Sequence, residues 1–120
     1  MSADEVVRSL ETGATQVGAP DDGDAIYVEL KHATRGADKL LLLKMLWVPE
    51  PMRHAGICRR VLDALEQRAD REHRLLAVGP IMADNDNNSF LGDLCARRGY
   101  TPTPPWMYIR DRRPPPDGAD

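Results

Sequence analysis

The chain has 120 residues, with 16 lysines and arginines against 19 aspartates and glutamates, so its formal net charge is −3. This length fits one domain, and a hydrophobic content of 42% can fill one modest core. The longest apolar stretch, Leu40–Val48, is too short for a membrane span, which takes roughly 20 residues. Two cysteines make no disulfide framework, so we expect a reduced, cytoplasmic setting. The composition excludes membrane, collagen-like and disulfide-rich classes.

The first part of the chain predicts a helix followed by a β-hairpin. Residues Ala3–Glu11 place apolar side chains on one helical face. A turn rich in Gly, Pro and Asp follows over 18–24. Ala25–Ala33 has the β-branched and aromatic content of a strand, and Thr34–Asp38 would connect it to an antiparallel partner.

The second part of the chain predicts alternating strands and helices. The near-continuous apolar run Leu40–Val48 indicates a central strand covered on both faces, ended by Pro49 and Pro51. The later elements are a helix from Ile57 to about Glu72, a strand over Leu75–Met82, a helix over Ser89–Arg98, and a closing edge strand at the end of Tyr100–Arg110. Within Leu75–Met82, Gly79-Pro80 indicates either a bulge or an early end of the strand. We therefore expect one mixed α/β domain over residues 1–113 and a disordered, proline-rich tail over 114–120.

The junction between the Leu40–Val48 strand and the next helix is the strongest candidate for a binding site. The first N–H groups of a helix have no partners within the helix, and the positive end of the helix dipole lies behind them. Together they attract an anion. Gly56 lets a phosphate approach the backbone closely, and Arg53 and Arg59 add positive charge. The alternative is an ordinary strand-to-helix connection with the same residues.

Two segments carry motifs that can be compared with a known family. Arg53-His-Ala-Gly56-Ile-Cys58 fits the pattern R/Q-x-x-G-x-G/A, except that Cys58 stands where Gly or Ala is preferred. Asn88–Tyr100 is similar in spacing to N-x-x-A-x-x-L-Y-x-x-x-G-F. With the strand before them and the helix between them, these segments resemble the GNAT superfamily of N-acetyltransferases over Leu40–Tyr100, about half of the chain.

This resemblance implies a fold and a co-substrate. The fold would be a central, mostly antiparallel sheet with one splayed parallel pair, flanked by helices. Acetyl-CoA would place its pantetheine arm along the main chain of Leu46–Val48 and its pyrophosphate on the N–H groups of 54–59. The residues that the resemblance assigns to acetyl-CoA are Leu46, Trp47, Val48, Arg53, His54, Ala55, Gly56, Ile57, Cys58, Arg59 and Asn88.

The implied chemistry is direct attack of a deprotonated amine on the thioester, with a backbone N–H polarising the carbonyl and an acid protonating the thiolate. Cys95 stands where many members of the family carry a tyrosine that acts as the general acid, so it is a candidate for that role. Its place beside Leu91 and Leu94 favours a packing role instead. Glu50 and Asp84, near strand ends, are the candidate bases.

Other readings and partners stay open. A catalytically inactive GNAT-fold protein with a binding, inhibitory or structural role, including a component of a virus particle, is favoured by the missing tyrosine and the short segment before the hairpin. A third possibility is an unrelated small α/β binding module. The acceptor would be an amine-bearing small molecule or protein, and the apolar run Trp106–Ile109 predicts a homodimer or a complex with another protein. The spacing of the three histidines predicts no metal site, and the short basic runs predict no nucleic-acid binding.

Overall fold

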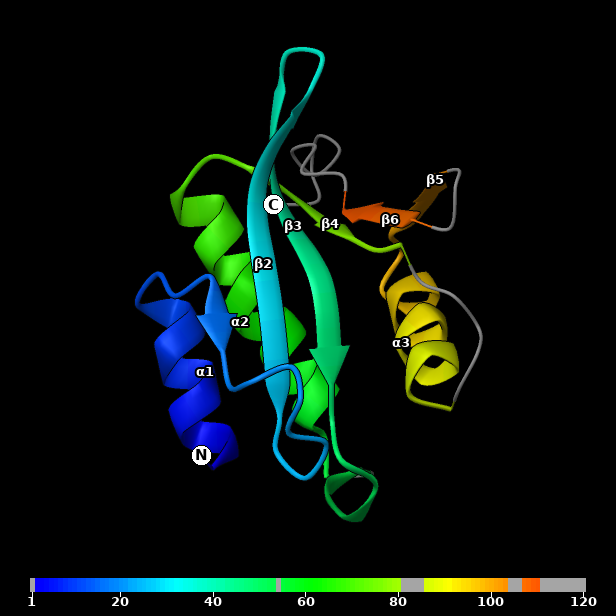
Figure 1. The fold of residues 1–120 in the computed structure, drawn as a ribbon. Coiled ribbons are helices and arrows are strands. Elements are labelled where there is room, and N and C mark those ends of the chain that lie inside the picture. Colours follow the sequence, from blue (N-terminus) through cyan, green and yellow to red (C-terminus); the bar gives the residue numbers. More distant parts are fainter. Residues whose placement is uncertain (1, 54, 81–85, 104–106, 111–120) are drawn as a thin grey trace, which may run out of the picture.

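A six-stranded mixed sheet flanked by helices forms the body of this α+β protein (Figure 1). The computed structural model describes residues 2–53, 55–80, 86–103 and 107–110, without the side chains of 86–89. The elements are α1 (Ala3–Glu11), β1 (Gln16–Val17), β2 (Tyr27–Arg35), β3 (Asp38–Trp47), the short 3-10 helix η1 (Glu50–Met52), α2 (Ile57–Arg71), β4 (Leu75–Val78), α3 (Asp86–Arg97), β5 (Thr101–Thr103) and β6 (Met107–Arg110). None of the helices in this part of the chain has the length and apolar content to cross a membrane.

The strands lie in the order β1-β2-β3-β4-β6-β5. Every neighbouring pair is antiparallel except β3 and β4, which run parallel from Leu40↔Leu75 to Leu43↔Val78. Helix α2 makes the crossover between these two strands, as a parallel pair requires. The strand β4 ends at Val78, directly before Gly79-Pro80, as predicted.

Strands β2 and β3 form a long hairpin whose turn is shorter than predicted. Arg35 pairs with Asp38, so the connection is only Gly36-Ala37, with Gly36 at a φ of 61°. The sequence predicted a connection over Thr34–Asp38, because this stretch holds Gly36. In the structure they extend the hairpin beyond the last pair shared with β4 and project from the body of the molecule (Figure 1).

A β-bulge sets which side chains of β3 point toward the helices. Glu29 pairs with Met45 while Leu30 pairs with Leu43, so Lys44 is an extra residue on β3. Without the bulge, strict alternation would place Leu43 and Leu46, which are three residues apart, on opposite faces of the sheet. With it, both leucines lie in the main core, and Met45 points outward with 51% of its surface exposed.

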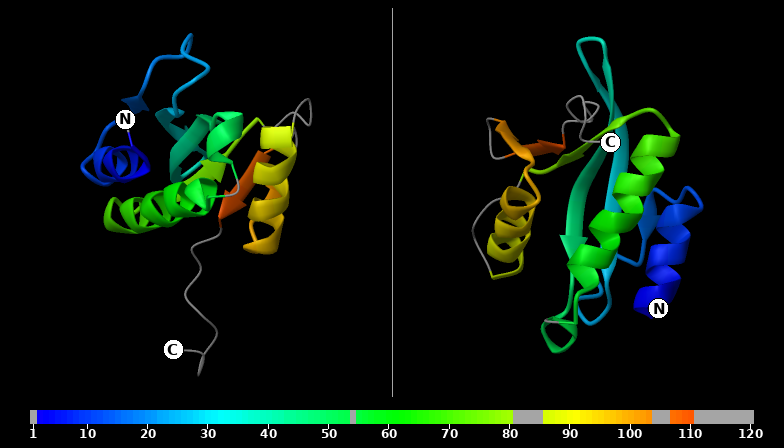
Figure 2. Two further views of the ribbon diagram at one scale, coloured as in Figure 1. Left: turned by 90° about the horizontal axis from the view of Figure 1, so that it is seen from below. Right: turned by 180° about the vertical axis from the view of Figure 1, so that it is seen from behind.

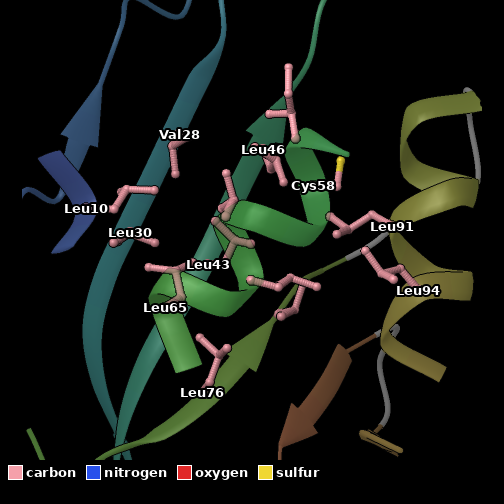
Figure 3. Close-up of a cluster of buried hydrophobic side chains, with 14 of the residues drawn as sticks. Leu10, Val28, Leu30, Leu43, Leu46, Cys58, Leu65, Leu76, Leu91 and Leu94 are labelled. Carbon is pink, nitrogen blue, oxygen red and sulfur yellow. The ribbon is translucent and has the colours of Figure 1, made fainter. Parts of the chain in front are cut away.

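The main core lies between one face of the sheet and the helices. Helices α1 and α2 lie side by side against the sheet, and α3 lies next to β6 (Figure 2). Figure 3 shows Leu91 and Leu94 pointing from α3 toward α2, which joins α3 to the same core. The α2 residues predicted to face inward are all buried: Ile57, Val61, Leu62, Leu65 and Ala69. The predicted amphipathic pattern of this helix is confirmed.

The opposite face of the sheet holds a smaller apolar cluster. Its buried members are Leu40, Ala77 and Ile109, one from each of β3, β4 and β6. The strand predicted over Leu40–Val48 is therefore covered on both faces in its first half, as expected. The prediction is wrong at Met45, because the bulge turns that side chain outward.

The C-terminal strands differ from the prediction in their order. Strand β6 lies inside the sheet between β4 and β5, so the edge is β5, which contains Pro102. Proline has no N–H for a ladder, so an edge strand accommodates it best. Within the predicted apolar run, Ile109 is buried in its own chain, and Trp106 and the tail 114–120 lie outside the described residues. The expected homodimer or protein complex stays a prediction.

Helix α3 begins at Asp86, three residues before the predicted Ser89. An acidic residue is favourable in the first turn of a helix because of the helix dipole, which explains the earlier start. The predicted first helix, in contrast, has the bounds expected from its sequence, with Ser2 accepting a hydrogen bond from the N–H of Glu5 as its cap.

Candidate functional site

The candidate site lies where the carboxyl end of β3 leads into α2. In parallel β-α-β units, ligands commonly bind at this edge of the sheet. Strand β3 continues to Trp47 beyond Leu43, its last residue paired with β4, and the Gly79 N–H donates to the Leu43 carbonyl oxygen at 3.0 Å. The turn η1 then brings the chain around to the start of α2 at Ile57.

The N-terminus of α2 lacks the side chains that usually satisfy a helix start. Its N-cap is Gly56, in the left-handed conformation at a φ of 76°, and it provides no side-chain cap. No acidic residue lies in the first turn. Among the described residues other than its chain neighbours, none has an atom within 4 Å of a Cβ placed on Gly56, so this part of the structure leaves space beside the cap. These features leave room for an external anion at the positive end of the helix.

Arg53 is fixed beside this helix start by two contacts with the end of β3. Its guanidinium carbon lies 4.9 Å from the centre of the Trp47 ring, and its Nε donates to the Val48 carbonyl oxygen at 2.9 Å. The Trp47 ring is held in turn, since its Nε1 donates to the Gly23 carbonyl oxygen at 2.9 Å. The arginine is therefore positioned before any ligand arrives.

Two further arginines lie beside one aromatic ring, that of Phe90 on α3. Arg59, in the first turn of α2, has its guanidinium carbon 5.8 Å from the centre of the Phe90 ring. Arg97, at the end of α3, lies 5.9 Å from the same ring. Both arginines are exposed, and Phe90 is half-buried against the main core. The distances fit cation–π contacts.

The arginine–carboxylate ion pairs among the described residues involve arginines other than those at this site. Six other arginines have a carboxylate within 4.0 Å: Arg35, Arg60, Arg68, Arg74, Arg98 and Arg110. Among the described residues, no carboxylate lies within that distance of Arg53, Arg59 or Arg97. Although the chain as a whole is acidic, these three arginines add positive charge near the α2 N-terminus that no described carboxylate neutralises within 4.0 Å.

The two cysteines lie in the core next to this site. Both are buried and unbonded to each other, Cys58 on α2 and Cys95 on α3. Burial raises the pKa of Cys58, although the charges of Arg53 and Arg59 act in the opposite direction. Burial raises the pKa of Cys95 to about 12. A thiol with this pKa is a poor proton donor to a leaving thiolate, whose own pKa lies several units lower.

The structure brings together part of the residue set predicted for acetyl-CoA. Trp47, Arg53, Gly56 and Arg59 surround the start of α2 as described above. The side chains of Leu46, Val48, Ile57 and Cys58 are buried, so only their main chain faces a ligand. Ala55 is exposed beside the cap.

The other predicted site residues either lie farther along the chain or are not among the described residues. Glu50 is exposed at the start of η1, where its carbonyl oxygen accepts from the Arg53 N–H at 3.1 Å. Asn88 lies in the first turn of α3, and its side chain is not described. His54 and Asp84 lie outside the described residues.

Sequence reasoning did not predict that Phe90 of α3 lies beside Arg59 of α2. The available signal was spacing, because Phe90 and Arg97 are seven residues apart and so share one helical face. The spacing could not show that this face meets Arg59, which depends on how α3 packs against α2.

Within the described residues, no three His, Cys, Asp or Glu side chains gather closely enough to hold a metal ion. No known protein family matches the chain, and no curated protein matches it significantly.

Proposed function

We propose that the protein is a GNAT-type N-acetyltransferase that binds acetyl-CoA at the start of α2 and transfers its acetyl group to an amine. The observation that carries this proposal is the helix N-terminus of α2, which has an open glycine cap, no acidic residue in its first turn and three arginines without carboxylate partners among the described residues. It follows a strand that belongs to the single parallel pair found among the described strands. The loop motif Arg53–Cys58 supports the proposal, as does the presence of a parallel pair, which the GNAT resemblance implies.

Acetyl-CoA fits the chemistry of these residues. Its pyrophosphate would accept hydrogen bonds from the first N–H groups of α2, while Arg53 supplies a charge-assisted contact. The buried side chains of Ile57 and Cys58 keep this turn anchored in the core, so the N–H groups stay fixed in direction. Cys58 is accommodated where the family prefers a smaller residue because its side chain points inward.

In the proposed reaction, the amine nitrogen attacks the thioester carbonyl carbon, the carbon–sulfur bond breaks, and an amide and CoA thiol are formed. The amine loses one proton, and the sulfur gains one. Because Cys95 is buried with a raised pKa, the proton on sulfur would come from water or from the acceptor's own ammonium group. Of the two candidate bases, Glu50 is the one that lies among the described residues, and it is exposed close to Arg53 in the chain.

The burial of Cys95 also favours a second candidate function, a GNAT-fold protein that binds CoA without catalysis. In this alternative the site binds CoA, and no residue acts as a general acid or a general base. The two functions make the same prediction for binding and opposite predictions for turnover.

Calorimetric titration with acetyl-CoA tests the site. We expect saturable binding that Gly56→Glu abolishes, since the new carboxylate lies at the phosphate position. Gly56→Gln carries the same backbone strain without the charge and should retain part of the affinity. Gly36→Glu, at another open glycine with positive φ, should bind like the wild type. Unchanged binding in a folded Gly56→Glu variant would place the ligand elsewhere.

Release of free CoA thiol separates the enzyme from the binding protein. Acetyl-CoA would be incubated with a polyamine, a lysine peptide or a peptide with a free N-terminus, and the thiol detected with a chromogenic reagent. Amine-dependent release above the hydrolysis background supports the enzyme. Binding without release from any of these acceptors supports the second candidate.

A further inference from the structure

Arg59 and Arg97 form, with Phe90, a cluster on α2 and α3 that the pyrophosphate site does not use. Two guanidinium groups from different helices converge on one ring, the only phenylalanine side chain in the protein. Their like charges repel each other, and among the described residues no carboxylate lies within 4.0 Å of either group. A pair of guanidinium groups of this kind is stabilised by a bound anion.

We propose that the Arg59–Phe90–Arg97 cluster binds the 3′-phosphate of CoA. This assignment depends on the function proposed above, because it extends the same ligand from the helix N-terminus toward α3. CoA carries two separate phosphate groups, a pyrophosphate and a ribose 3′-phosphate. The N–H groups of α2 and Arg53 account for the first and leave Arg97, at the far end of α3, for the second.

Each member of the cluster has a distinct task. Arg97 contacts the phosphate through its guanidinium group, which matches phosphate oxygens in a bidentate manner. Arg59 lies at the first turn of α2 and faces the 3′-phosphate from the other side. Phe90 is a positioning residue, since its ring holds both guanidinium groups in reach without neutralising them.

The test compares CoA with dephospho-CoA, which differs only in lacking the 3′-phosphate, by calorimetry on the full chain. The wild type should bind CoA about tenfold or more tightly than dephospho-CoA, the usual scale for charge-assisted contacts. Arg97→Gln should lose this preference while its affinity for dephospho-CoA stays unchanged. Phe90→Leu should reduce the preference and leave dephospho-CoA binding intact. Arg8→Gln removes an exposed arginine on α1 and should keep the wild-type preference.

The possible failures are distinguishable. Equal binding of CoA and dephospho-CoA by the wild type would overturn the 3′-phosphate assignment and leave the acetyl-CoA site in place. An equal loss of affinity for both ligands in Arg97→Gln would also overturn it, because Arg97 would then contact a part that both share. Absence of binding for both ligands in the wild type would overturn the proposed function itself.

Discussion

The guanidinium group of Arg68 donates a 2.7 Å hydrogen bond to the carbonyl oxygen of Ala14, 54 residues away in the chain. The same side chain donates to the carbonyl oxygens of Leu10 and Gly13, and its Nε donates to Glu72 at 2.9 Å. Only 1% of Arg68 is exposed. One buried cation therefore satisfies the carboxyl end of α1 and fixes it to α2.

We expect Arg68→Met to destabilise the protein by about 3 kcal/mol. The substitution keeps most of the apolar stem but leaves several buried acceptors without a donor. Arg71→Met is the matched control, since Arg71 is exposed on the same helix and donates to the Glu11 carbonyl oxygen. Its expected cost is about 0.5 kcal/mol. Urea unfolding measures both, and similar costs for the two variants would refute this role of Arg68.

The stability of the protein should depend on the ionisation of Glu72. Burial raises the pKa of this carboxyl group, but the hydrogen bond and charge of Arg68, with the charges of His32 and Arg74, lower it further than burial raises it. A lowered folded-state pKa adds stability above the unfolded value of 4.5, and this stability is lost as the pH falls through the folded value. Glu72→Gln should therefore be less stable than the wild type at about pH 6, with the difference shrinking toward about pH 3.

Unfolding titrations at the two pH values measure this difference. Glu11→Gln, which removes a carboxylate from an exposed position on α1, serves as the control for net charge. A difference for Glu72→Gln that is independent of pH would exclude the linkage.

The Tyr100 hydroxyl should contribute to stability through Glu66. Tyr100 is buried and donates to Glu66 Oε2 at 2.5 Å, and Arg98 donates to the same oxygen at 3.0 Å. Burial, together with this carboxylate, raises the pKa of Tyr100, so the hydroxyl stays protonated and remains a donor. Tyr100→Phe should cost about 1.5 kcal/mol, because hydrogen bonds to charged groups are stronger than neutral ones. Tyr108→Phe, at a half-buried position, should cost less than about 0.5 kcal/mol in the same thermal unfolding assay.

Cys95 should act in packing. Its side chain is fully buried in the main core, and its raised pKa of about 12 leaves little thiolate at neutral pH. Cys95→Ala should lower stability by about 1 kcal/mol and leave acetyl-CoA affinity unchanged. In the native wild type, alkylation of this thiol by iodoacetamide should be much slower than in urea. A loss of turnover by about 100-fold at an unaltered melting temperature would instead identify Cys95 as the catalytic acid.

The predictable part of the fold is the part set by local pattern. The bounds of α1 and the buried face of α2 follow from apolar spacing, and the end of β4 follows from Gly79-Pro80. The two-residue strand β1 was missed because it is too short to show any alternation. The outward position of Met45 was missed because a bulge depends on the partner strand.

The candidate site was predictable to a similar extent. Gly56 and the arginines near it could be located because a strand-to-helix junction is visible in sequence. The buried state of Arg68 could have been inferred, since it lies three residues after Leu65 on the apolar stripe of the helix. The position of Arg59 and Arg97 beside the same Phe90 ring could not have been inferred, because it depends on how α2 packs against α3. Local spacing in the sequence carries no information on that packing.

The β2–β3 hairpin has a practical consequence for engineering. The pairs Thr34↔Lys39 and Arg35↔Asp38 lie beyond the part of β3 that pairs with β4. The turn at Gly36 has open space around it among the described residues. An epitope or fluorescent-label sequence inserted between Gly36 and Ala37 would enlarge only this exposed turn, and longer flexible loops cost little, roughly 0.6 kcal/mol for each doubling. The tip of the hairpin is thus the place where the chain can be lengthened for labelling or tethering without disturbing α2, its arginines or the core.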